Sequence, residues 1–570
     1  MRLARINLNE EIINYEEITE NSKFFLLGAR GLSSQIVHDE VPSKCDPFGQ
    51  KNKLVIANGI LTGSPFPNSG RTSIGGKSPL TGGIKEANVG GRSSIMMARH
   101  GIRAFVLEGK ASNWKIIILD QNGVKIEDGD EYVGLGNYEL CEKLYEKYGD
   151  RIGIYSIGPA GEHLMKASTV AVNDLEGYPS RHAARGGLGS VMGSKKVKAM
   201  IIIPPKKSKF NIKNIDDLRS IIKPFAKKLA TTKETFSIYG TPMMIAAMSE
   251  YGGLPTKGFR KGAYDDAQKI SGEKLHEMVT KRGGKKRLAC SPTCVIRCSN
   301  LVVDEKGNHI TSSLEYETIA LNGSNLLIND LDIIARIDHA CDNAGIDTIE
   351  FGASIGLAMD AGRIDWGDSK EIFKILNEIE DGTERGRLFG NGICHLANEI
   401  DYERVPHVKG QALSAYDPRV FKGMSVTFAT SPMGADHTAG AAIAGRTART
   451  GKDYGDLTDN EGKLDLSYEL QIYTAILDSM GCCYFIGPAY ETMELVADAI
   501  NAIYGINLSR DDVIDIGKTI LRNELDFNRK AGITDDFNKL PKFFRSEPSN
   551  PVELKVSIPE EELKNFWKDL

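Results

Sequence analysis

Three of the chain's nine cysteines fall within nine consecutive residues, in the run Cys290-Ser-Pro-Thr-Cys294-Val-Ile-Arg-Cys298. Thiolates spaced this closely can converge on one soft metal centre, so this segment is expected to fold around the group that it binds. The cysteine total is odd and most of the others stand singly, which argues against a disulfide framework and for a reducing compartment. The run therefore constrains the fold more than any other feature of the chain.

A four-iron cluster needs a fourth thiolate in addition to the three of this run. Cys482 and Cys483 are the only other adjacent cysteines, and they are the natural donors. Two alternatives stay open on spacing alone. One is structural zinc, which prefers a second Cys or Cys/His pair that this chain does not supply in tidy form. The other is three inert buried thiols. We favour the four-iron cluster.

Glycine is the outlier of the composition, at 59 of 570 residues, where roughly 7% is average. Nine glycines fall in residues 59–91, and a second dense patch lies in residues 184–193. Glycine lets the backbone approach a ligand closely and present amide groups to phosphate. Neither patch matches a Walker A loop or a strand–helix G-x-G-x-x-G motif. Tight β-turns stay open as an explanation, but two such patches, containing Arg71 and Arg185, favour one large polyanionic ligand.

The pattern of apolar residues changes along the chain. Short aliphatic runs between glycine, proline and asparagine predict strands near residues 103–108, 114–119, 168–172 and 199–203. After a linker that begins at Pro204, helical spacing predicts helices from about residues 214 and 330, and over 466–480 and 489–504. We predict an α+β protein, with a β-rich cofactor-binding domain at 1–205 and two mainly α-helical domains. Residues 206–415 would carry the three-cysteine run and 416–570 the fourth cysteine, with the cofactor between the domains.

Charge and hydropathy exclude several classes of protein. A net charge of −5 on 570 residues gives no sign of a nucleic-acid binder. The N-terminus lacks the apolar segment of a signal peptide, and the aliphatic runs are far shorter than the ~20 residues that span a bilayer. We expect a soluble cytoplasmic protein with no nucleic-acid or membrane partner. The basic run at residues 281–287 either docks an acidic electron carrier by electrostatic steering or is a solvated loop.

A short motif recurs after two of the predicted helices. Asp342-Asn-Ala-Gly345 ends one helix and Asp478-Ser-Met-Gly481 ends the other, and both glycines fall where a left-handed helix C-cap is expected. An aspartate in the last turn opposes the helix dipole, so its presence twice suggests a ligand rather than a role in stability. A carboxylate can accept paired N–H donors from a heterocycle. The second copy also leads directly into the paired cysteines.

Taken in order, these motifs resemble the tungsten-containing aldehyde:ferredoxin oxidoreductases over nearly the full chain. The resemblance rests on the cysteine run, both D-x-x-G motifs and five further segments: Asn68-Ser-Gly-Arg71, Ala87-Asn88-Val-Gly-Gly91, Arg185-Gly-Gly-Leu-Gly, Glu315-Tyr316-Glu317-Thr318 and Gly434-Ala-Asp-His437. Each is modest alone, and their order together is specific. The resemblance implies a tungsten or molybdenum ion held by the dithiolenes of two pterin cofactors, whose phosphates are bridged by magnesium.

The resemblance also implies roles for individual residues. Glu317 and His437 would face the metal as acid–base and hydrogen-bonding groups while R–CHO is oxidised to R–COOH. The electrons would leave singly through a [4Fe–4S] cluster to ferredoxin or another electron-transfer subunit. The residues implied to bind the cofactor are Arg71 at a phosphate, Asn88 and Ala183 at the magnesium, Asp342 and Asp478 at the pterin rings, and Arg185, Asp347 and Cys482 nearby. The residues implied to bind the cluster are Cys290, Cys294, Cys298 and Cys483.

Three departures from the family pattern matter. The first gap of the cysteine run has three residues where two are expected. Position 482 is Cys where an aliphatic residue is usual, so Cys482 and Cys483 compete as the fourth ligand, and we expect Cys483 from its spacing to Asp478. Arg336-Ile-Asp-His339 lacks the glutamate of the E-x-x-H motif through which some members bridge their dimer with a metal. We therefore expect no bridging metal, and a homodimer stays open.

Several functions are weighed. The preferred one is the oxidation of aldehydes to carboxylic acids by an anaerobic enzyme that passes electrons to ferredoxin. A close alternative is the catalytic subunit of a related low-potential tungsten enzyme, such as an aromatic acyl-CoA reductase. From other classes, an iron–sulfur electron carrier without catalysis of its own and a zinc-stabilised nucleotide-binding protein stay open. The physiological substrate, tungsten or molybdenum, and the partner are left undecided by the sequence.

Overall fold

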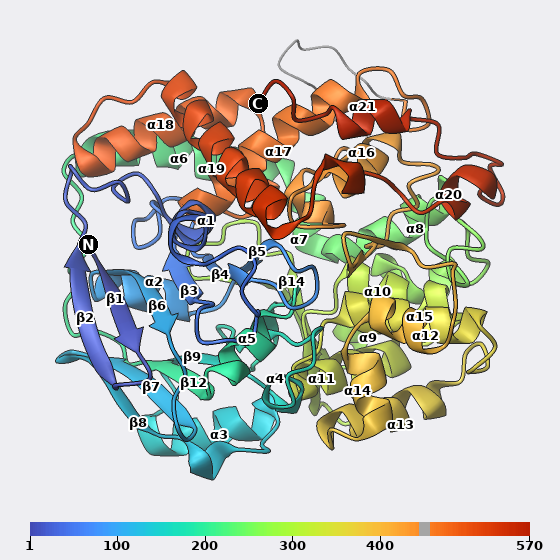
Figure 1. Cartoon of the computed structure of the whole chain (residues 1–570), viewed down its shortest axis with the longest axis horizontal. Coiled ribbons are helices and arrows are strands. Elements are labelled where there is room, and N and C mark those ends of the chain that lie inside the picture. The colour runs from blue at the N-terminus through green and yellow to red at the C-terminus, as the bar shows by residue number, and fades with distance from the viewer. Residues whose placement is uncertain (444–455) are drawn as a thin grey trace.

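The computed structural model describes residues 1–443 and 456–570. Its N-terminal region contains two six-stranded sheets that share one apolar core (Figure 1). The strand orders are β2-β1-β6-β3-β4-β5 and β11-β10-β9-β12-β7-β8. The strands are β1 (Arg2–Asn7), β2 (Ile12–Glu17), β3 (Leu54–Asn58), β4 (Thr72–Lys77), β5 (Ile84–Val89), β6 (Ile102–Glu108), β7 (Lys115–Asp120), β8 (Gly123–Asp128), β9 (Gly153–Ser156), β10 (Val170–Val172), β11 (Arg181–Ala183) and β12 (Val197–Ile202).

Helices cover the outer faces of both sheets. In β3, Leu54 packs between the sheets, whereas its neighbour Val55 packs in the core beneath α1 (Ala29–Glu40). Successive side chains of a strand point to opposite faces, so a strand buried on both faces is apolar throughout. The second sheet has its own outer core, to which α3 (Asn137–Tyr148) contributes. The predicted β-rich N-terminal region is confirmed.

The rest of the chain is mainly helical and forms two further cores. One surrounds α12 (Thr348–Asp360), which is buried along most of its length. The other joins α17 (Lys463–Met480), α18 (Tyr490–Tyr504) and α19 (Arg510–Ala531). The early helix α6 (Ile215–Thr232) packs in this second core, and segments near the C-terminus pack in the first. Chain segments therefore cross between the cores, and the predicted boundaries at 205 and 415 stay predictions.

Other elements that position the site are α5 (Leu188–Ser194), α7 (Glu234–Tyr239), α9 (Gly272–Lys281), α10 (Tyr316–Asn322), α11 (Leu331–Ala344), α13 (Ser369–Glu380) and α16 (Lys422–Thr430). A small sheet, β13 (Lys285–Leu288), β14 (Ser299–Val303) and β15 (His309–Ser312), flanks the cysteine run. None of the helices in residues 1–443 and 456–570 has the length and apolar character needed to cross a bilayer.

The two D-x-x-G motifs end α11 and α17, as predicted. Gly345 has a φ of 73° and Gly481 a φ of 74°, the left-handed conformation that glycine adopts without strain. Both helix ends contact the β-rich region through the backbone. The N–H of Thr169 donates to the carbonyl of Gly345 at 2.9 Å, and the N–H of Arg71 donates to that of Gly481 at 3.0 Å. Each motif is thus held against the glycine-rich half of the chain.

Candidate active site

Each D-x-x-G aspartate meets a basic side chain from the β-rich region. Oδ1 of Asp342 lies 3.0 Å from Nε2 of His182, which β11 carries. Oδ2 of Asp478 lies 3.2 Å from Nη1 of Arg30, near the start of α1. Burial raises the pKa of Asp478 to about 6, although the charges of Arg30 and Arg71 oppose the rise. The two motifs therefore make similar contacts with the same region.

Arg71 lies near both the second motif and the cysteines. Its Nη2 donates to the backbone carbonyl of Asn88 at 3.2 Å, and its Nε donates to the side-chain Oδ1 of the same residue. Burial alone would lower the pKa of Arg71, but its interactions with nearby titratable groups, first among them Cys483, raise it. The fold thus brings together Arg71, Asn88 and Cys483, which are predicted to bind phosphate, magnesium and the iron–sulfur cluster respectively.

The four predicted cluster cysteines lie close enough to influence one another. The interaction between the Cys290 and Cys294 thiols lowers the pKa of Cys290 and raises that of Cys294. Burial raises the pKa of Cys298, and the charges of Cys290 and Cys483 raise it further. Cys294 is buried and the other three are partly exposed. No three His, Cys, Asp or Glu side chains of the described residues converge on a single-ion site.

Asn68 joins the cysteine run to Cys483. Its backbone carbonyl accepts from the N–H of Cys483 at 2.9 Å, and its Nδ2 lies 3.6 Å from Sγ of Cys294. The backbone N–H groups of Arg297 and Phe485 donate to Sγ of Cys294 and Cys483, at 3.3 Å and 3.4 Å. Hydrogen bonds of this kind favour thiolates and tune the potential of a cluster bound to them.

The adjacent cysteines occupy different surroundings. Cys482 is fully buried in the apolar core formed by α17, α18 and α19, and burial raises its pKa well above the ordinary value. Cys483 is partly exposed, and the charges of Arg71 and Cys290 both act on its pKa, which burial raises to about 11. Cys483 has extended backbone, in which successive side chains project in opposite directions. The two thiols therefore do not compete for one place.

Glu317 and His437 face each other. Oε1 of Glu317 lies 3.5 Å from Nε2 of His437, while Oε2 accepts from the N–H of Ala415 at 2.7 Å. Glu317 stands in the first turn of α10, and burial raises its pKa against the opposing effect of His437. The ring of Tyr416 lies 6.0 Å from that of His437, centroid to centroid. Two predicted catalytic side chains from distant segments are thus brought together.

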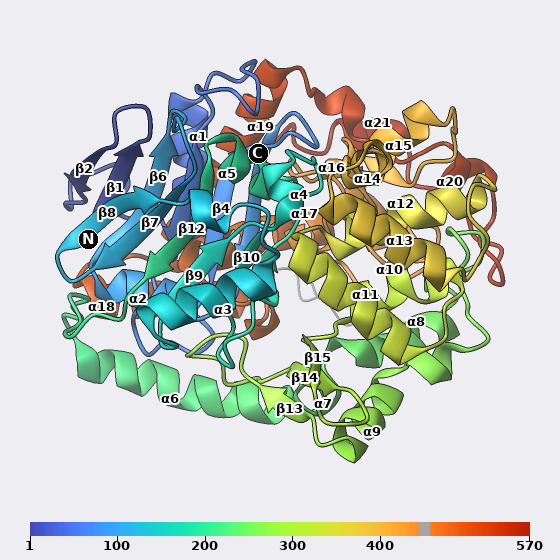
Figure 2. The same cartoon turned by 90° about the horizontal axis from the view of Figure 1, so that it is seen from below.

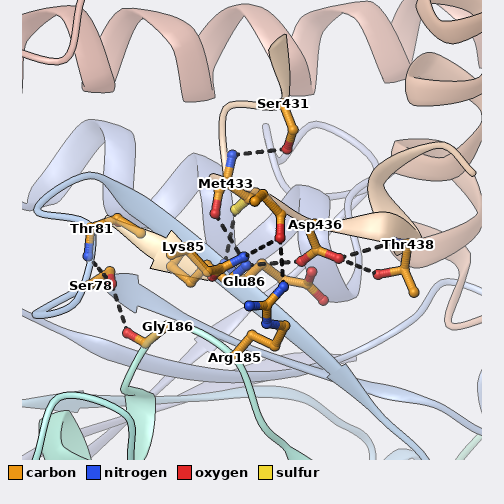
Figure 3. Close-up of polar contacts among 12 residues, drawn as sticks. Ser78, Thr81, Lys85, Glu86, Arg185, Gly186, Ser431, Met433, Asp436 and Thr438 are labelled. Atoms are coloured by element: carbon orange, nitrogen blue, oxygen red, sulfur yellow. Dashed lines mark hydrogen bonds and ion pairs between the residues drawn. The ribbon is translucent and has the colours of Figure 1, made fainter. Parts of the chain in front are cut away.

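The turn that carries His437 is anchored by a buried lysine (Figure 3). Nζ of Lys85, on β5, lies 3.0 Å from Oδ2 of Asp436, and the lysine side chain has no exposed surface. Oδ1 of Asp436 accepts from the backbone N–H of Thr438 at 3.0 Å and so caps the turn. Burial alone would raise the pKa of Asp436, but the charges of Lys85, Arg185 and His437 hold it well below its ordinary value.

Arg185 binds the same segment from the glycine-rich side. Its guanidinium donates to the carbonyl of Ala412 at 2.6 Å and to that of Ala435. Its Nε lies 3.4 Å from Oδ2 of Asp347, whose other oxygen caps the start of α12. Ala183 is fully buried on β11. Arg185 and Asp347 therefore link the β-rich region to the helical region, and both have protein partners.

Several predicted site residues carry buried polar atoms that lack a hydrogen-bond partner in the described structure. A buried unsatisfied group costs about 1–3 kcal/mol, so such atoms are uncommon in folded proteins. Their presence on these residues fits a polar ligand whose donors and acceptors complete them. The donor set, with an arginine and four thiols close by, fits a phosphate-bearing heterocycle beside an iron–sulfur group. The atoms are Nδ2 of Asn88, Oε1 of Glu317, Oδ2 of Asp342 and Nδ1 of His437.

Four residues of the site were not predicted: Arg30, Lys85, His182 and Asp436. His182 and Asp436 directly precede Ala183 and His437, so their position beside a predicted residue is a usable signal. Arg30 and Lys85 carry no local signal. Their partners Asp478 and Asp436 are 448 and 351 residues away in the chain.

Two family models match the chain. The model described as "Aldehyde ferredoxin oxidoreductase, N-terminal domain" matches residues 3–203, and "Aldehyde ferredoxin oxidoreductase, domains 2 & 3" matches residues 219–569. The tungsten-containing aldehyde ferredoxin oxidoreductase of Pyrococcus furiosus is 32% identical over 98% of this chain and 94% of its own length. That of Pyrococcus horikoshii is 31% identical over the same shares.

Two more distant proteins also resemble the chain, one in sequence and one in fold. The WOR-like subunit of the aliphatic sulfonate oxidoreductase of Pyrococcus furiosus is 24% identical over 100% of this chain and 94% of its own length. The solved active-site complex BamBC of benzoyl coenzyme A reductase with 1,5-dienoyl-CoA superimposes with a TM-score of 0.82. It is 18% identical and covers 99% of this chain and 93% of the other, a level at which the likeness concerns the fold alone.

Proposed function

The chain belongs to the aldehyde ferredoxin oxidoreductase family, and on this premise we propose that it oxidises aldehydes to carboxylic acids at a tungsten or molybdenum bis-pterin centre. The reaction is R–CHO + H2O → R–COOH + 2 H+ + 2 e−. It needs an electron acceptor, a proton acceptor and an exit for the electrons. The observation that carries the proposal is the pair Glu317 and His437. Nε2 of His437 lies 3.5 Å from Oε1 of Glu317, and each residue has a buried polar atom with no hydrogen-bond partner among the described residues.

The residues of this pair supply the proton chemistry. When bound, the tungsten or molybdenum bis-pterin accepts the two electrons from the substrate. The carboxylate of Glu317 takes a proton as the water-derived oxygen adds, and its burial makes it a stronger base than an exposed glutamate. His437 polarises the carbonyl or orients the incoming oxygen by a hydrogen bond. The Lys85–Asp436 ion pair holds the turn that carries His437 in place.

The cofactor would lie between the β-rich region and the two D-x-x-G motifs. The unpartnered Oδ2 of Asp342 supports a role in accepting N–H groups of a pterin ring, and Asp478 would play the same part for the second ring. Arg71 would bind phosphate. Nδ2 of Asn88 has no hydrogen-bond partner among the described residues, so it could donate to a further acceptor. Asn88 and the backbone around Ala183 would serve the bridging magnesium. Arg185, Asp347 and Cys482 would hold in place the segments that bind the cofactor.

Electrons would leave through a [4Fe–4S] cluster held by Cys290, Cys294, Cys298 and Cys483. Cys483 is preferred to Cys482 because it lies partly exposed near Cys290, whereas Cys482 is enclosed in an apolar core. Arg71 lies close enough to Cys483 to affect its pKa, which supports a short path from the cofactor to the cluster. Ferredoxin or another electron-transfer subunit would then accept the electrons one at a time.

Elemental analysis and dye-linked assays test the proposal. Purified protein should contain about four Fe and one W or Mo per chain, and it should reduce benzyl viologen with several aldehydes. Iron without tungsten or molybdenum would instead identify an electron carrier, and zinc with no visible absorption a zinc protein. Metal-loaded protein that turns over no aldehyde would contradict the proposed reaction.

A reductase of aromatic acyl-CoA thioesters is the second candidate. The similarity of fold to the BamBC complex favours it. Such a subunit would oxidise 1,5-dienoyl-CoA with a dye and leave simple aldehydes unchanged, which separates the two candidates in one set of assays.

A further inference from the structure

The stretch around the cysteine run is basic in a chain that is slightly acidic overall. No acidic residue occurs between Glu277 and Asp304, while the chain as a whole carries a net charge of −5. We call the six cations of this stretch the basic strip: Lys281, Arg282, Lys285, Lys286, Arg287 and Arg297. Local charge of one sign on such a background creates a directional field for a charged partner.

The fold places the strip on an open sheet edge. β13, which holds three of its cations, is an outer strand of the order β13-β14-β15 and leads directly into Cys290. Figure 2 shows β13 at the margin of the molecule, near α9. Lys281, Lys285, Arg287 and Arg297 are exposed to solvent. The strip is therefore accessible along its length.

Most of this charge has no acidic partner among the described residues. Lys285 pairs with Glu176, and Arg282 pairs with Asp332 and lies 3.9 Å from Glu305. Lys286 contacts the side chains of His276 and Thr280 and makes no ion pair with the described residues. The remaining three cations, Lys281, Arg287 and Arg297, make no ion pair with any residue of the described structure. Four of the six charges are thus available to a partner.

The strip is joined covalently and by hydrogen bonding to the proposed cluster ligands. Arg287 precedes Cys290 by three residues, and Arg297 directly precedes Cys298. The backbone N–H of Arg297 donates to Sγ of Cys294 at 3.3 Å, while its side chain is exposed. Cys290 and Cys298 are themselves partly exposed. A protein that covers the strip would therefore lie close in the chain to the proposed cluster ligands.

We propose that the basic strip is the docking surface for an acidic one-electron carrier protein with an iron–sulfur group. This inference rests on the proposed function and adds the surface at which its electrons leave. An acidic carrier would be steered to the strip by charge and would take up one electron per encounter. Because the cations are exposed, the complex would be transient and sensitive to salt.

Charge reversal on the strip tests the surface. The variant is Lys281→Glu with Arg287→Glu in the holoenzyme, and the matched control is Arg363→Glu, an exposed arginine in the turn after α12 that makes no side-chain ion pair with the described residues. The probe is a purified ferredoxin of net negative charge. At about 10 mM salt, the double variant should raise the KM for ferredoxin by at least about tenfold. Its rate with benzyl viologen should equal that of the wild type, and Arg363→Glu should change neither.

A binding measurement separates this proposal from the proposed function. Calorimetric titration of oxidised ferredoxin into the holoenzyme needs no turnover, and it should show affinity that the double variant lowers and that about 0.5 M salt abolishes. If the enzyme did not oxidise aldehydes with the dye, the proposed function would be contradicted, but the calorimetric test of ferredoxin binding would still be valid. Wild-type affinity in the double variant would overturn the docking surface. Binding of a short oligonucleotide as tight as that of ferredoxin would also overturn it, because the strip would then be a general polyanion site.

Discussion

Nζ of Lys85 lies 3.0 Å from Oδ2 of Asp436, and the lysine side chain is wholly enclosed. The pair joins β5, an outer strand of its sheet in the β-rich region, to the turn that presents His437 to Glu317. Removing one partner of a buried ion pair leaves an uncompensated charge, whereas an exposed pair of the same geometry contributes little. The contact is therefore suited to fixing the position of His437 rather than to adding stability.

Lys85→Met should disturb catalysis through this turn. We expect turnover with viologen to fall roughly 10- to 100-fold, because a small displacement of His437 would misalign it with the substrate. The pH profile of kcat should shift as well. Lys85→Arg keeps the charge and should recover much of the rate. Steady-state kinetics across pH, with tungsten and iron contents measured in parallel, provide the check. A wild-type profile in Lys85→Met would refute the positioning role.

The two adjacent cysteines should differ on substitution. Cys483→Ser removes a proposed ligand and should lower the iron content and the visible absorption of the cluster. Cys482→Ser changes a thiol in an apolar core, so it should retain the iron and show only reduced thermal stability. Iron analysis and electron paramagnetic resonance distinguish these outcomes. The reverse pattern would assign the fourth ligand to Cys482.

Glu317→Gln should separate proton transfer from cofactor binding. The amide keeps the shape of the side chain but cannot accept the proton, so turnover should fall about 10²–10⁴-fold. Tungsten and iron contents should stay at wild-type levels, since Glu317 is not proposed as a ligand. Loss of metal in this variant would instead indicate a structural role.

On the acidic side of the pH profile, the loss of activity should follow the protonation of the buried Glu317 carboxylate. Burial raises the pKa of Glu317, and only the deprotonated form accepts a proton. Activity should therefore be lost as pH falls through a value above the ~4.3 of an ordinary glutamate. The charge of His437 lowers this pKa, so His437→Asn should move this loss of activity to higher pH in addition to slowing turnover. Loss of activity only at or below pH ~4 would contradict the assignment of Glu317 as base.

Arg30 should matter for stability. Its Nε and Nη2 donate to both oxygens of Glu524 at 2.9 Å and 2.8 Å, and both side chains are buried. Arg30→Met leaves the carboxylate of Glu524 uncompensated, at a cost of about 3–5 kcal/mol. Urea unfolding should show this loss, and the double change with Glu524→Leu should recover part of it. Arg219→Met, which breaks the exposed pair with Asp216, should have no measurable effect.

Most of the fold prediction depended on patterns of apolar residues and glycine within short stretches of the sequence. The strands near 103–108 and 199–203, and the helices that became α6, α11, α17 and α18, depend on apolar spacing within a few residues. The helix ends at Gly345 and Gly481 follow from the backbone freedom of glycine. The packing of α6 with α17–α19 was not predictable, because it joins segments separated by more than two hundred residues and no local pattern specifies it.

The candidate site divides in the same way. By itself the sequence determined which residues bear chemistry: the clustered thiols, the repeated aspartates, Glu317 and His437. Only the tertiary structure decided which of them meet. It directed Cys482 into a core and Cys483 towards the cysteine run, and it joined Lys85 to Asp436 and Arg30 to Asp478 across most of the chain. The physical reason is that residue chemistry and helix ends are set by neighbours in the chain, whereas side-chain direction and ion pairing depend on how distant elements pack.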